Sequence, residues 1–311
     1  MRWIQGVWVC GLLSAMLGCA SEATRRTASA SYDTERAVVE LGDSRVSLYQ
    51  YGGVPFKPYM KELRTPAGLN VLRDAPADHL HHHGLMFALE VDGVDFWGET
   101  AGCGVQQHAS MSAVSHIGED GLHGTFVEAL HWLAPDGRVL LDERRTMDTC
   151  IGATAVVVTW RSELRRPAGM EPARIGGRHY FGLGARFVEA MDAGGRFFNA
   201  EGRPGEVFRG EERLVSSRWC AYRSRIGEHD VTVAMFDGPD NPRPATWFTM
   251  TEPFAYLSAT MAYHEQEIML PPGETLTVAY GVAVWDGTPS AAQIEAAYAR
   301  WKASLAEVAS Q

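Results

Sequence analysis

Residues 130–141, L-H-W-L-A-P-D-G-R-V-L-L, place a turn signal between two runs of alternating apolar residues. The P-D-G tripeptide is typical of a β-turn, because proline presets one backbone angle and glycine tolerates the left-handed conformation. Leu130 and Trp132 precede the turn, and Val139 and Leu141 follow it. Side chains alternate between the faces of a strand, so this stretch predicts a β-hairpin.

Most of the remaining chain has the same strand-like content of β-branched and aromatic residues, interrupted by Gly, Pro, Asp and Asn. No linker rich in proline or serine divides it, so we predict one all-β domain over residues 35–311. The predicted strands are 38–51, 85–91, 124–133, 139–147, 153–160, 180–188, 231–236, 254–262 and 275–284.

The last segment has helical periodicity instead. After T-P-S at 288–290, a plausible helix start, apolar residues recur at the spacing of one helix face. We therefore predict one C-terminal amphipathic helix that packs on the sheet or over its end. The residues on its apolar face are Ile294, Ala297, Tyr298, Trp301, Leu305 and Val308.

The first residues are typical of an export signal. Arg2 supplies a positive charge, and residues 4–17 are mostly apolar but too short to span a bilayer comfortably. The L-G-C-A sequence around Cys19 resembles a bacterial lipobox, in which the chain is cut before a cysteine that is then diacylated. We expect a signal peptide at 1–18, a lipidated Cys19, and a flexible tether over 19–34.

Such a chain would be lipid-anchored in the cell envelope, on the periplasmic side of the outer membrane, and would meet the membrane through this lipid only. An ordinary signal with a chance cysteine is the alternative. The net charge of −10, without a basic stripe, argues against a nucleic-acid partner. Of the other cysteines, Cys103, Cys150 and Cys220 can form at most one disulfide, and we expect them to be mostly buried.

The segment P-A-D-H-L-H-H-H-G-L holds four histidines in five residues. If it is extended, His79, His81 and His83 share one face and His82 points the other way. Three imidazoles on one face could bind a divalent metal such as zinc, copper or iron, transfer protons, or donate hydrogen bonds to a substrate. Asp78 could orient one ring.

Basic and aromatic residues near this run could complete a site. Arg64 and Arg73 could clamp a carboxylate or a pair of sugar hydroxyls, with surface salt bridging as the alternative. Trp97 could be a stacking platform or a core residue. Arg178 and Arg186 flank the F-G-L-G sequence and could face the same cleft; its glycines fit strand packing.

In the C-terminal half, G-P-D-N-P-R-P-A-T-W-F forms a polar, proline-rich loop. Loops on a rigid β scaffold often carry binding residues. Asp240, Asn241, Arg243 and Trp247 are therefore candidates to hold a ligand.

Several motifs together resemble the PmoA-like family, which carries the label "methane oxygenase PmoA". The resemblance covers about residues 35–300 and includes F-K-P-Y, L-R-T-P-A-G-L-N-V-L-R-D, V-D-G-V-D-F-W, the histidine run, D-N-P-R and L-P-P-G-E-T-L-T-V-A-Y-G-V-A-V-W-D-G. This copy has Gly238 where the resemblance would lead us to expect histidine. Methane oxidation is rejected, because the mature chain has no apolar run of 18 residues.

The resemblance implies an exported, sugar-related protein. It also implies a large antiparallel β-sandwich, similar to the galactose-mutarotase-like supersandwich, with a C-terminal helix; no established catalytic residues come with it. Three functions stay open: a carbohydrate-active lyase, hydrolase or epimerase; a non-catalytic lipoprotein that binds glycan; and a metal-dependent protein. The candidate catalytic residues are His81, His83, Arg73 and Arg243; the substrate-binding ones are Arg64, Trp97, Asp240, Asn241 and Trp247; and the metal ligands are His79, His81 and His83.

Overall fold

The predicted hairpin is present in the structure, a computed structural model that describes residues 27–308. Strands β9 (Leu122–Leu133) and β10 (Val139–Ile151) pair antiparallel, and Gly137 between them has a φ of +84°. Leu130, Trp132 and Leu141 are buried on the inner face. The expected signal peptide and lipidated Cys19 lie outside the described residues.

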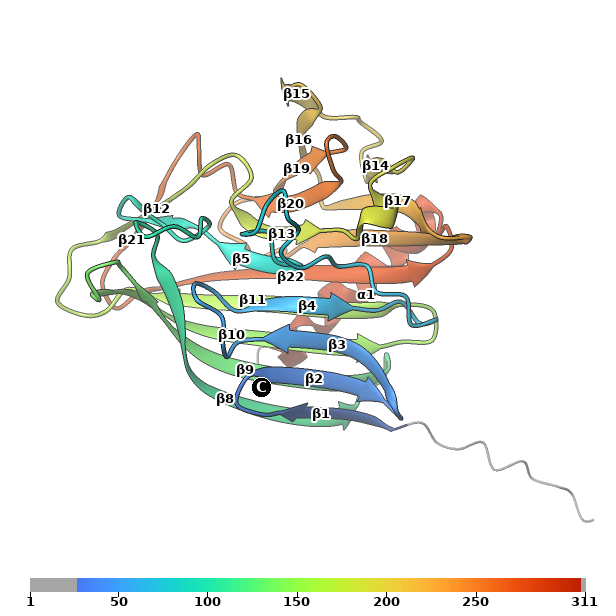
Figure 1. The fold of residues 1–311 in the computed structure, drawn as a ribbon, viewed down its shortest axis with the longest axis horizontal. Coiled ribbons are helices and arrows are strands. Elements are labelled where there is room, and N and C mark those ends of the chain that lie inside the picture. Colours follow the sequence, from blue (N-terminus) through green and yellow to red (C-terminus); the bar gives the residue numbers. More distant parts are fainter. Residues whose placement is uncertain (1–26, 309–311) are drawn as a thin grey trace, which may run out of the picture.

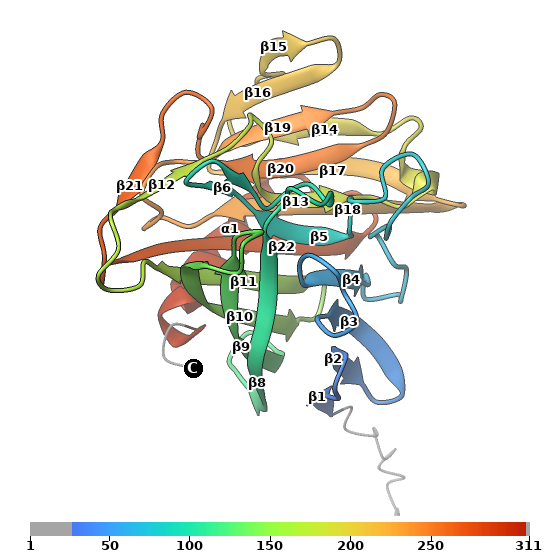
Figure 2. The same cartoon turned by 60° about the vertical axis from the view of Figure 1, so that its left-hand side comes forward.

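Two large sheets face each other (Figures 1 and 2), and every strand pairing within them is antiparallel. The ten-stranded sheet contains, in spatial order, β1 (Ala28–Tyr32), β2 (Arg36–Leu41), β3 (Ser44–Gln50), β4 (Tyr59–Leu63), β5 (Leu85–Ala88), β13 (Gly182–Arg186), β20 (Tyr256–Thr260), β19 (Thr246–Met250), β16 (Glu212–Ser216) and β15 (Glu206–Arg209). The eight-stranded sheet contains β14 (Arg196–Asn199), β17 (Trp219–Ile226), β18 (His229–Asp237), β22 (Thr275–Asp286), β11 (Val156–Arg165), β10, β9 and β8 (Val105–Ile117).

A small third sheet and two helical segments complete the fold. The third sheet contains β21 (Ile268–Leu270), β12 (Ala173–Gly176), β6 (Glu90–Val91) and β7 (Val94–Asp95), and the short 3₁₀ helix is η1 (Glu189–Met191). The chain is thus a large antiparallel β-sandwich with one C-terminal helix, as the sequence predicted.

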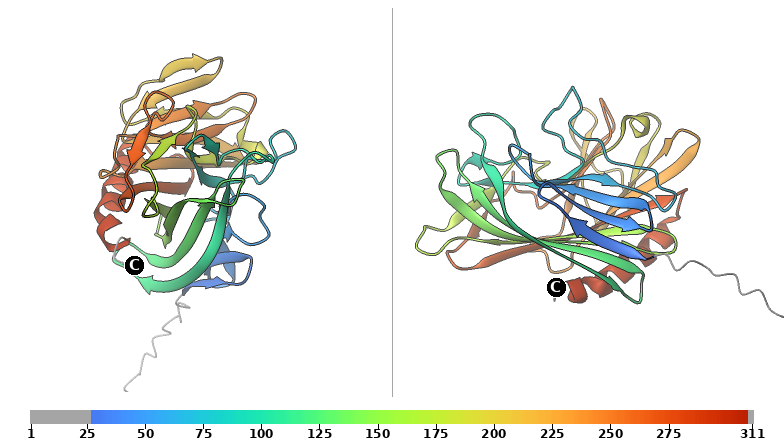
Figure 3. Two further views of the ribbon diagram at one scale, coloured as in Figure 1. Left: turned by 90° about the vertical axis from the view of Figure 1, so that its left-hand side faces the viewer. Right: turned by 60° about the horizontal axis from the view of Figure 1, so that its bottom comes forward.

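Helix α1 (Ala291–Val308) packs outside the sandwich, against the eight-stranded sheet (Figure 3). It begins with a capping box: Ser290 Oγ accepts the Gln293 backbone N–H, and Gln293 Oε1 accepts the Ser290 N–H. Ile294 and Trp301 are buried in a cluster with Phe236 and other sheet residues. The predicted apolar helix face is therefore the one that contacts the sheet.

Two predicted boundaries were wrong. The tether was expected to reach residue 34, but Ala28–Tyr32 is strand β1, hydrogen-bonded to β2 at the sheet edge. The segment 38–51 was expected to be one strand, but a turn at Gly42, with a φ of +59°, divides it into β2 and β3. An edge strand of small polar residues has little apolar signal, and backbone pairing alone defines it.

Cys103, Cys150 and Cys220 are all buried and free, in agreement with the expectation for small buried residues. No helix in residues 27–308 has the length and apolarity needed to cross a membrane.

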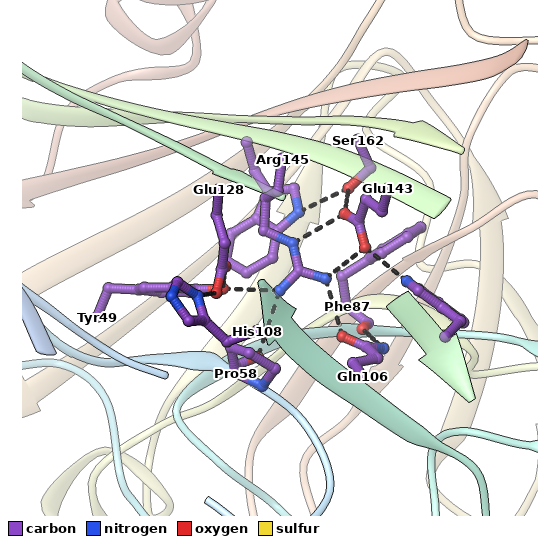
Figure 4. Close-up of polar contacts among 11 residues, drawn as sticks. Tyr49, Pro58, Phe87, Gln106, His108, Glu128, Glu143, Arg145 and Ser162 are labelled. Carbon is purple, nitrogen blue, oxygen red and sulfur yellow. Dashed lines mark hydrogen bonds and ion pairs between the residues drawn. The ribbon is translucent and has the colours of Figure 1, made fainter. Parts of the chain in front are cut away.

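A charged network joins the two sheets inside the sandwich (Figure 4). The Arg145 side chain is fully buried, and it donates two hydrogen bonds of 2.8 Å to the Glu143 carboxylate. It also donates to Tyr49 Oη, at 2.8 Å, and to Gln106 Oε1, at 2.9 Å. Tyr49 donates in turn to Glu128, which is also buried. A buried ion pair of this kind costs desolvation but fixes which residues face inward.

We predict that Arg145→Met destabilises the protein by about 3–5 kcal/mol, because Glu143 would remain buried without its cation. Arg144 is the matched control: it is the neighbouring residue of β10, partly exposed, and paired with Glu163 at 3.0 Å. Arg144→Met should cost less than about 1 kcal/mol. Urea denaturation of the three proteins measures both, and equal losses would contradict a special role for Arg145.

Candidate functional site

The histidine run is not a strand, and the predicted arrangement of its side chains was wrong. The His79 N–H donates to Pro76 O and the His82 N–H donates to His79 O, each at 2.9 Å, so the run follows two successive turns. Proline and aspartate in P-A-D favour such turns. As a result His82 lies with His79 and His81, with ring centroids 4.7 and 4.6 Å away, and His83 points elsewhere.

These three rings face side chains from one surface of the ten-stranded sheet. Strand register pairs Arg186 with Tyr256, Tyr256 with Met250, and Ser258 with both Gly184 and Phe248. Residues directly opposite one another share a face, and residues two apart along a strand do so as well. This surface therefore presents Tyr256 and Phe248 side by side toward the histidine turns.

The result is a cleft of about 450 Å³, called here the histidine cleft. His79, His81 and His82 form one wall. The other lining side chains are aromatic, apolar or charged. They are Trp97, Tyr180, Phe248, Met250, Pro253, Phe254, Tyr256, Arg178, Arg209 and Glu212.

Aromatic contacts hold the floor of the histidine cleft in place. Trp97 stacks on Phe181 with 5.1 Å between ring centroids and 10° between planes, and the His82 ring lies 5.2 Å from Tyr256. Gly184 makes this packing possible, since a Cβ there would lie 2.1 Å from Tyr256 Oη and 2.9 Å from a Trp97 ring atom. The glycines of F-G-L-G therefore serve strand packing, as expected.

Three buried polar atoms at this floor have no hydrogen-bond partner within the described chain: His82 Nδ1, Trp97 Nε1 and Tyr256 Oη. Buried polar groups in native proteins are nearly always satisfied, so such atoms need an explanation. All three residues line the same cleft. The floor is thus aromatic in shape and carries hydrogen-bonding capacity that the protein itself does not use.

Two histidines of the cleft, His81 and His82, are held neutral. Burial, with the neighbouring His81 and His79, lowers the pKa of His82 to about 2. Burial, with the charge of Lys57, also lowers the pKa of His81 below its usual value. A neutral imidazole near pH 7 can accept a proton. Asp78, expected beside one of these rings, lies 3.1 Å from His79 Nδ1.

Charged residues lie around the opening of the cleft. Arg178 is exposed and donates to Tyr180 Oη at 3.3 Å. Arg209 is largely exposed and pairs with Glu212 at 2.6 Å. The sequence analysis did not identify Arg209, Glu212, Phe254 or Tyr256 as site residues; the E-P-F-A-Y segment was a signal for the two aromatic ones.

His83 belongs to a separate ionic network beneath the cleft. Its Nδ1 lies 2.7 Å from Asp74 and its Nε2 lies 3.0 Å from Glu99. Burial opposes its charge, but these two carboxylates raise the pKa of His83. The buried Lys57 donates to Glu99 at 2.7 Å and to the Trp97 carbonyl at 2.8 Å. The network holds the Trp97 backbone in place. His83 was predicted to share a face with His79 and His81, but it does not line the cleft.

The two arginines predicted to form a clamp lie away from the cleft. Arg73 pairs with Glu189 at 3.1 Å, and Arg64 pairs with Glu62 at 2.8 Å. Neither lines the histidine cleft, so the predicted clamp at these positions is not formed there. Arg186 lies nearby, buried with its guanidinium 3.4 Å from the Phe254 ring centroid.

The polar loop of the C-terminal half also lies outside this cleft. Asn241 bonds the backbone of Ala279 in both directions, and Arg243 donates to the carbonyls of Gln266 and Glu267. These contacts fix the loop itself. The same segment contains Asp240, which is absent from the cleft lining.

Trp247 is fully buried, and its Nε1 donates to Ser217 O at 2.6 Å. It is a core residue and does not line the cleft, so it is not placed there to hold a ligand as the sequence predicted. Of the two tryptophans considered, only Trp97 lines the cleft.

The predicted metal set of His79, His81 and His83 is not assembled. Within residues 27–308, the one group of three ligand-type side chains whose ligand atoms all lie within 4.8 Å of one another is Asp120, His123 and Cys150. None of these lines the histidine cleft. The separation of His83 from the other rings explains the difference.

Comparison with known families gives one match. A family model described as "Family of unknown function (DUF6807)" matches residues 36–299. This is a different family from the PmoA-like family named above, so that assignment was wrong. No curated protein matches the chain.

The structure is similar to solved carbohydrate-related proteins. The galactosidase domain of an α-galactosidase–sucrose kinase, AgaSK, is 10% identical with a TM-score of 0.49, over 83% of this chain and 42% of that chain. A galactose mutarotase-like protein from Clostridium acetobutylicum is 11% identical with a TM-score of 0.47, over 84% of this chain and 99% of that chain. The chain thus spans about two fifths of the galactosidase chain, and the fold class rests on the sheets described above.

We predict that His82 makes the protein sensitive to mild acid. Its folded pKa lies below its unfolded value of about 6.5, so the unfolded chain takes up the proton first and stability falls as pH drops below 6.5. From pH 7 to pH 5, His82 should account for a loss of about 2 kcal/mol. Urea denaturation at both pH values should show this loss to be smaller by that amount in His82→Phe. His131→Phe is the surface control and should lose as much stability between the two pH values as the wild type. The same loss in His82→Phe would contradict the prediction.

Proposed function

The chain belongs to the family of unknown function DUF6807, and we propose that it acts on a carbohydrate in the histidine cleft, with His81 transferring the proton. The observation that carries this proposal is the composition of the cleft floor. Trp97 and Tyr256 combine aromatic surface with unpartnered hydrogen-bonding atoms, and His82 adds a third such atom.

A sugar ring matches this floor chemically. Its C–H faces pack against aromatic side chains, and its hydroxyls both donate and accept hydrogen bonds. Trp97 Nε1 can only donate, whereas Tyr256 Oη and neutral His82 can do either, depending on tautomer.

His81 is the best candidate for the reacting group. It lines the cleft and is half-buried, and its lowered pKa keeps it neutral at pH 7. A neutral imidazole with a pKa near or somewhat below the working pH serves as a general base. His82 lies deeper, and its pKa of about 2 is too low for efficient proton transfer near neutrality.

The charged side chains favour a substrate with an acidic group. Arg178 and Arg209 line the opening, and guanidinium groups bind carboxylates well. A carboxylate held there would make the proton on its neighbouring carbon more acidic. His81 could then remove that proton, with elimination or epimerisation following.

Hydrolysis by a pair of carboxylic acids is less well supported. The usual glycosidase mechanism needs two carboxyl groups across the bond that is broken. Glu212 is the only carboxylate among the residues that line the histidine cleft, and it already pairs with Arg209. Proton transfer by histidine therefore fits the residues better.

A non-catalytic glycan-binding protein is the second candidate, because the aromatic floor supports binding without any reaction. In either case we propose that Cys19 is lipidated and that the protein works at the cell envelope, where polysaccharide fragments are available.

We predict that His81→Gln abolishes turnover of an acidic oligosaccharide but changes its affinity less than about tenfold, since glutamine keeps hydrogen-bonding capacity and removes the base. A panel of uronate-containing and neutral oligosaccharides, assayed by mass spectrometry and isothermal titration calorimetry, gives both quantities. In the wild type, kcat/KM should fall on the acid side with a midpoint below 6.5, because protonated His81 cannot accept a proton.

His131→Gln is the matched control, because His131 is a surface histidine of β9 that pairs with Asp142 and lies outside the cleft. It should leave both quantities unchanged. Binding without turnover in the wild type would support the glycan-binding function instead. Absence of both across the panel would overturn the carbohydrate proposal.

We also predict that Arg178→Ala and Arg209→Ala each weaken binding of an acidic oligosaccharide by about tenfold, the loss of one charge-assisted hydrogen bond of about 1.5 kcal/mol. Neutral oligosaccharides should be affected much less. Arg138→Ala, at the exposed tip of the β9–β10 turn, is the control. Equal losses for acidic and neutral ligands would contradict recognition of an acidic group.

A further inference from the structure

A second cluster of reactive side chains lies at the end of the eight-stranded sheet, where β8 turns into β9. The register pairs His116 of β8 with His123 of β9, and His123 with Cys150 of β10. Residues directly opposite one another on adjacent strands point to the same face. The sheet therefore places two imidazoles and a thiol in one row.

The tight turn between β8 and β9 adds a carboxylate to this row. The Gly118 N–H donates to Gly121 O at 2.9 Å, and the turn folds Asp120 back so that its Oδ1 lies 2.8 Å from His123 Nε2. A Cβ at position 118 would lie 2.8 Å from His123 Nε2, so a larger residue there would displace this imidazole. Asp120, His123 and Cys150 thereby bring one ligand atom each within 4.8 Å of the others.

A second carboxylate orients the imidazole from behind. Asp148 Oδ2 lies 2.8 Å from His123 Nδ1, and Asp148 Oδ1 accepts a hydrogen bond from Thr125 Oγ1 at 2.7 Å. The Asp148 side chain is only 4% exposed. A carboxylate on the rear nitrogen is the usual partner of a metal-binding histidine, because it fixes the ring and raises its basicity.

The cluster opens into a cavity of about 230 Å³ between this sheet and helix α1. Trp301 and Ser304 of α1 line the far side, and none of the lining residues is shared with the histidine cleft. His116 stacks on His123 with 4.5 Å between ring centroids, and its buried Nδ1 has no partner within the described chain. The cavity therefore offers space for a further ligand beside the three side chains.

We propose that Asp120, His123 and Cys150 bind a divalent metal ion of the zinc class, with one coordination position open to this cavity. Zinc accepts thiolate, imidazole and carboxylate ligands, and three protein ligands with one open position is a common arrangement. A thiolate ligand disfavours magnesium and calcium, which prefer oxygen. This site is independent of the function proposed for the histidine cleft.

The test is a titration of the purified full-length protein with Co²⁺, which substitutes for zinc and shows a thiolate-to-cobalt absorption band. We expect one equivalent to bind with this band, and Zn²⁺ to displace it. Cys150→Ser should abolish the band, and Asp120→Asn should weaken binding. Asp148→Asn, which alters a positioning residue, should lower affinity by about 10–100-fold while the band remains.

Cys103→Ser and His131→Asn are the matched controls. Cys103 is a buried cysteine, and His131 lies on β9, as His123 does, and pairs with Asp142 of β10. Both variants should bind the metal as the wild type does. If Cys150→Ser is unstable, alkylation of wild-type Cys150 gives the answer, since Zn²⁺ should protect this thiol and leave Cys103 unprotected. Absence of binding, an unchanged band in Cys150→Ser, no zinc protection, or loss of binding in His81→Gln would each overturn the proposal.

Discussion

The fold depends on one buried cation. Arg145 lies between the two sheets with no exposed surface, and its five N–H donors are satisfied by Glu143, Tyr49, Gln106 and the Pro58 carbonyl. These partners come from β10, β3 and β8 and from the segment before β4. The guanidinium therefore fixes which residues of both sheets point into the sandwich. A slip of β10 by one residue would turn Arg145 outward and leave its partners buried without a cation.

Buried charged residues also support the histidine cleft. Lys57, next to the carbonyl that Arg145 contacts, donates to the Trp97 carbonyl and to Glu99, and Glu99 also contacts His83. One ionic network therefore holds both the backbone of Trp97 and the end of the histidine run. The cleft lies where loops meet a rigid sheet, and its floor is positioned by charged residues that do not line it.

The sequence predicted what local pattern determines and missed what depends on distant partners. The predictions of the P-D-G hairpin and of the apolar face of α1 were correct, because the spacing of apolar residues and the turn-forming residues are local features of the sequence. Strand β8 was missed because its polar residues carry little apolar alternation. Trp247 was misassigned as a ligand-binding residue because only packing distinguishes a core tryptophan from one that lines a site. The histidine run was identified, but its turns reversed the roles of His82 and His83.

The contacts of each histidine determine whether its ring is neutral or charged. His82 lies among aromatic rings, so burial keeps it neutral. His83 contacts two carboxylates, which favour its charged form. His123 also lies between two carboxylates, with a thiol added; burial opposes its charge, but Asp148 and Cys150 help raise its pKa to about 11. Such a pocket favours positive charge. A neutral base and a cation site thus arise from one residue type, because the number of nearby carboxylates differs.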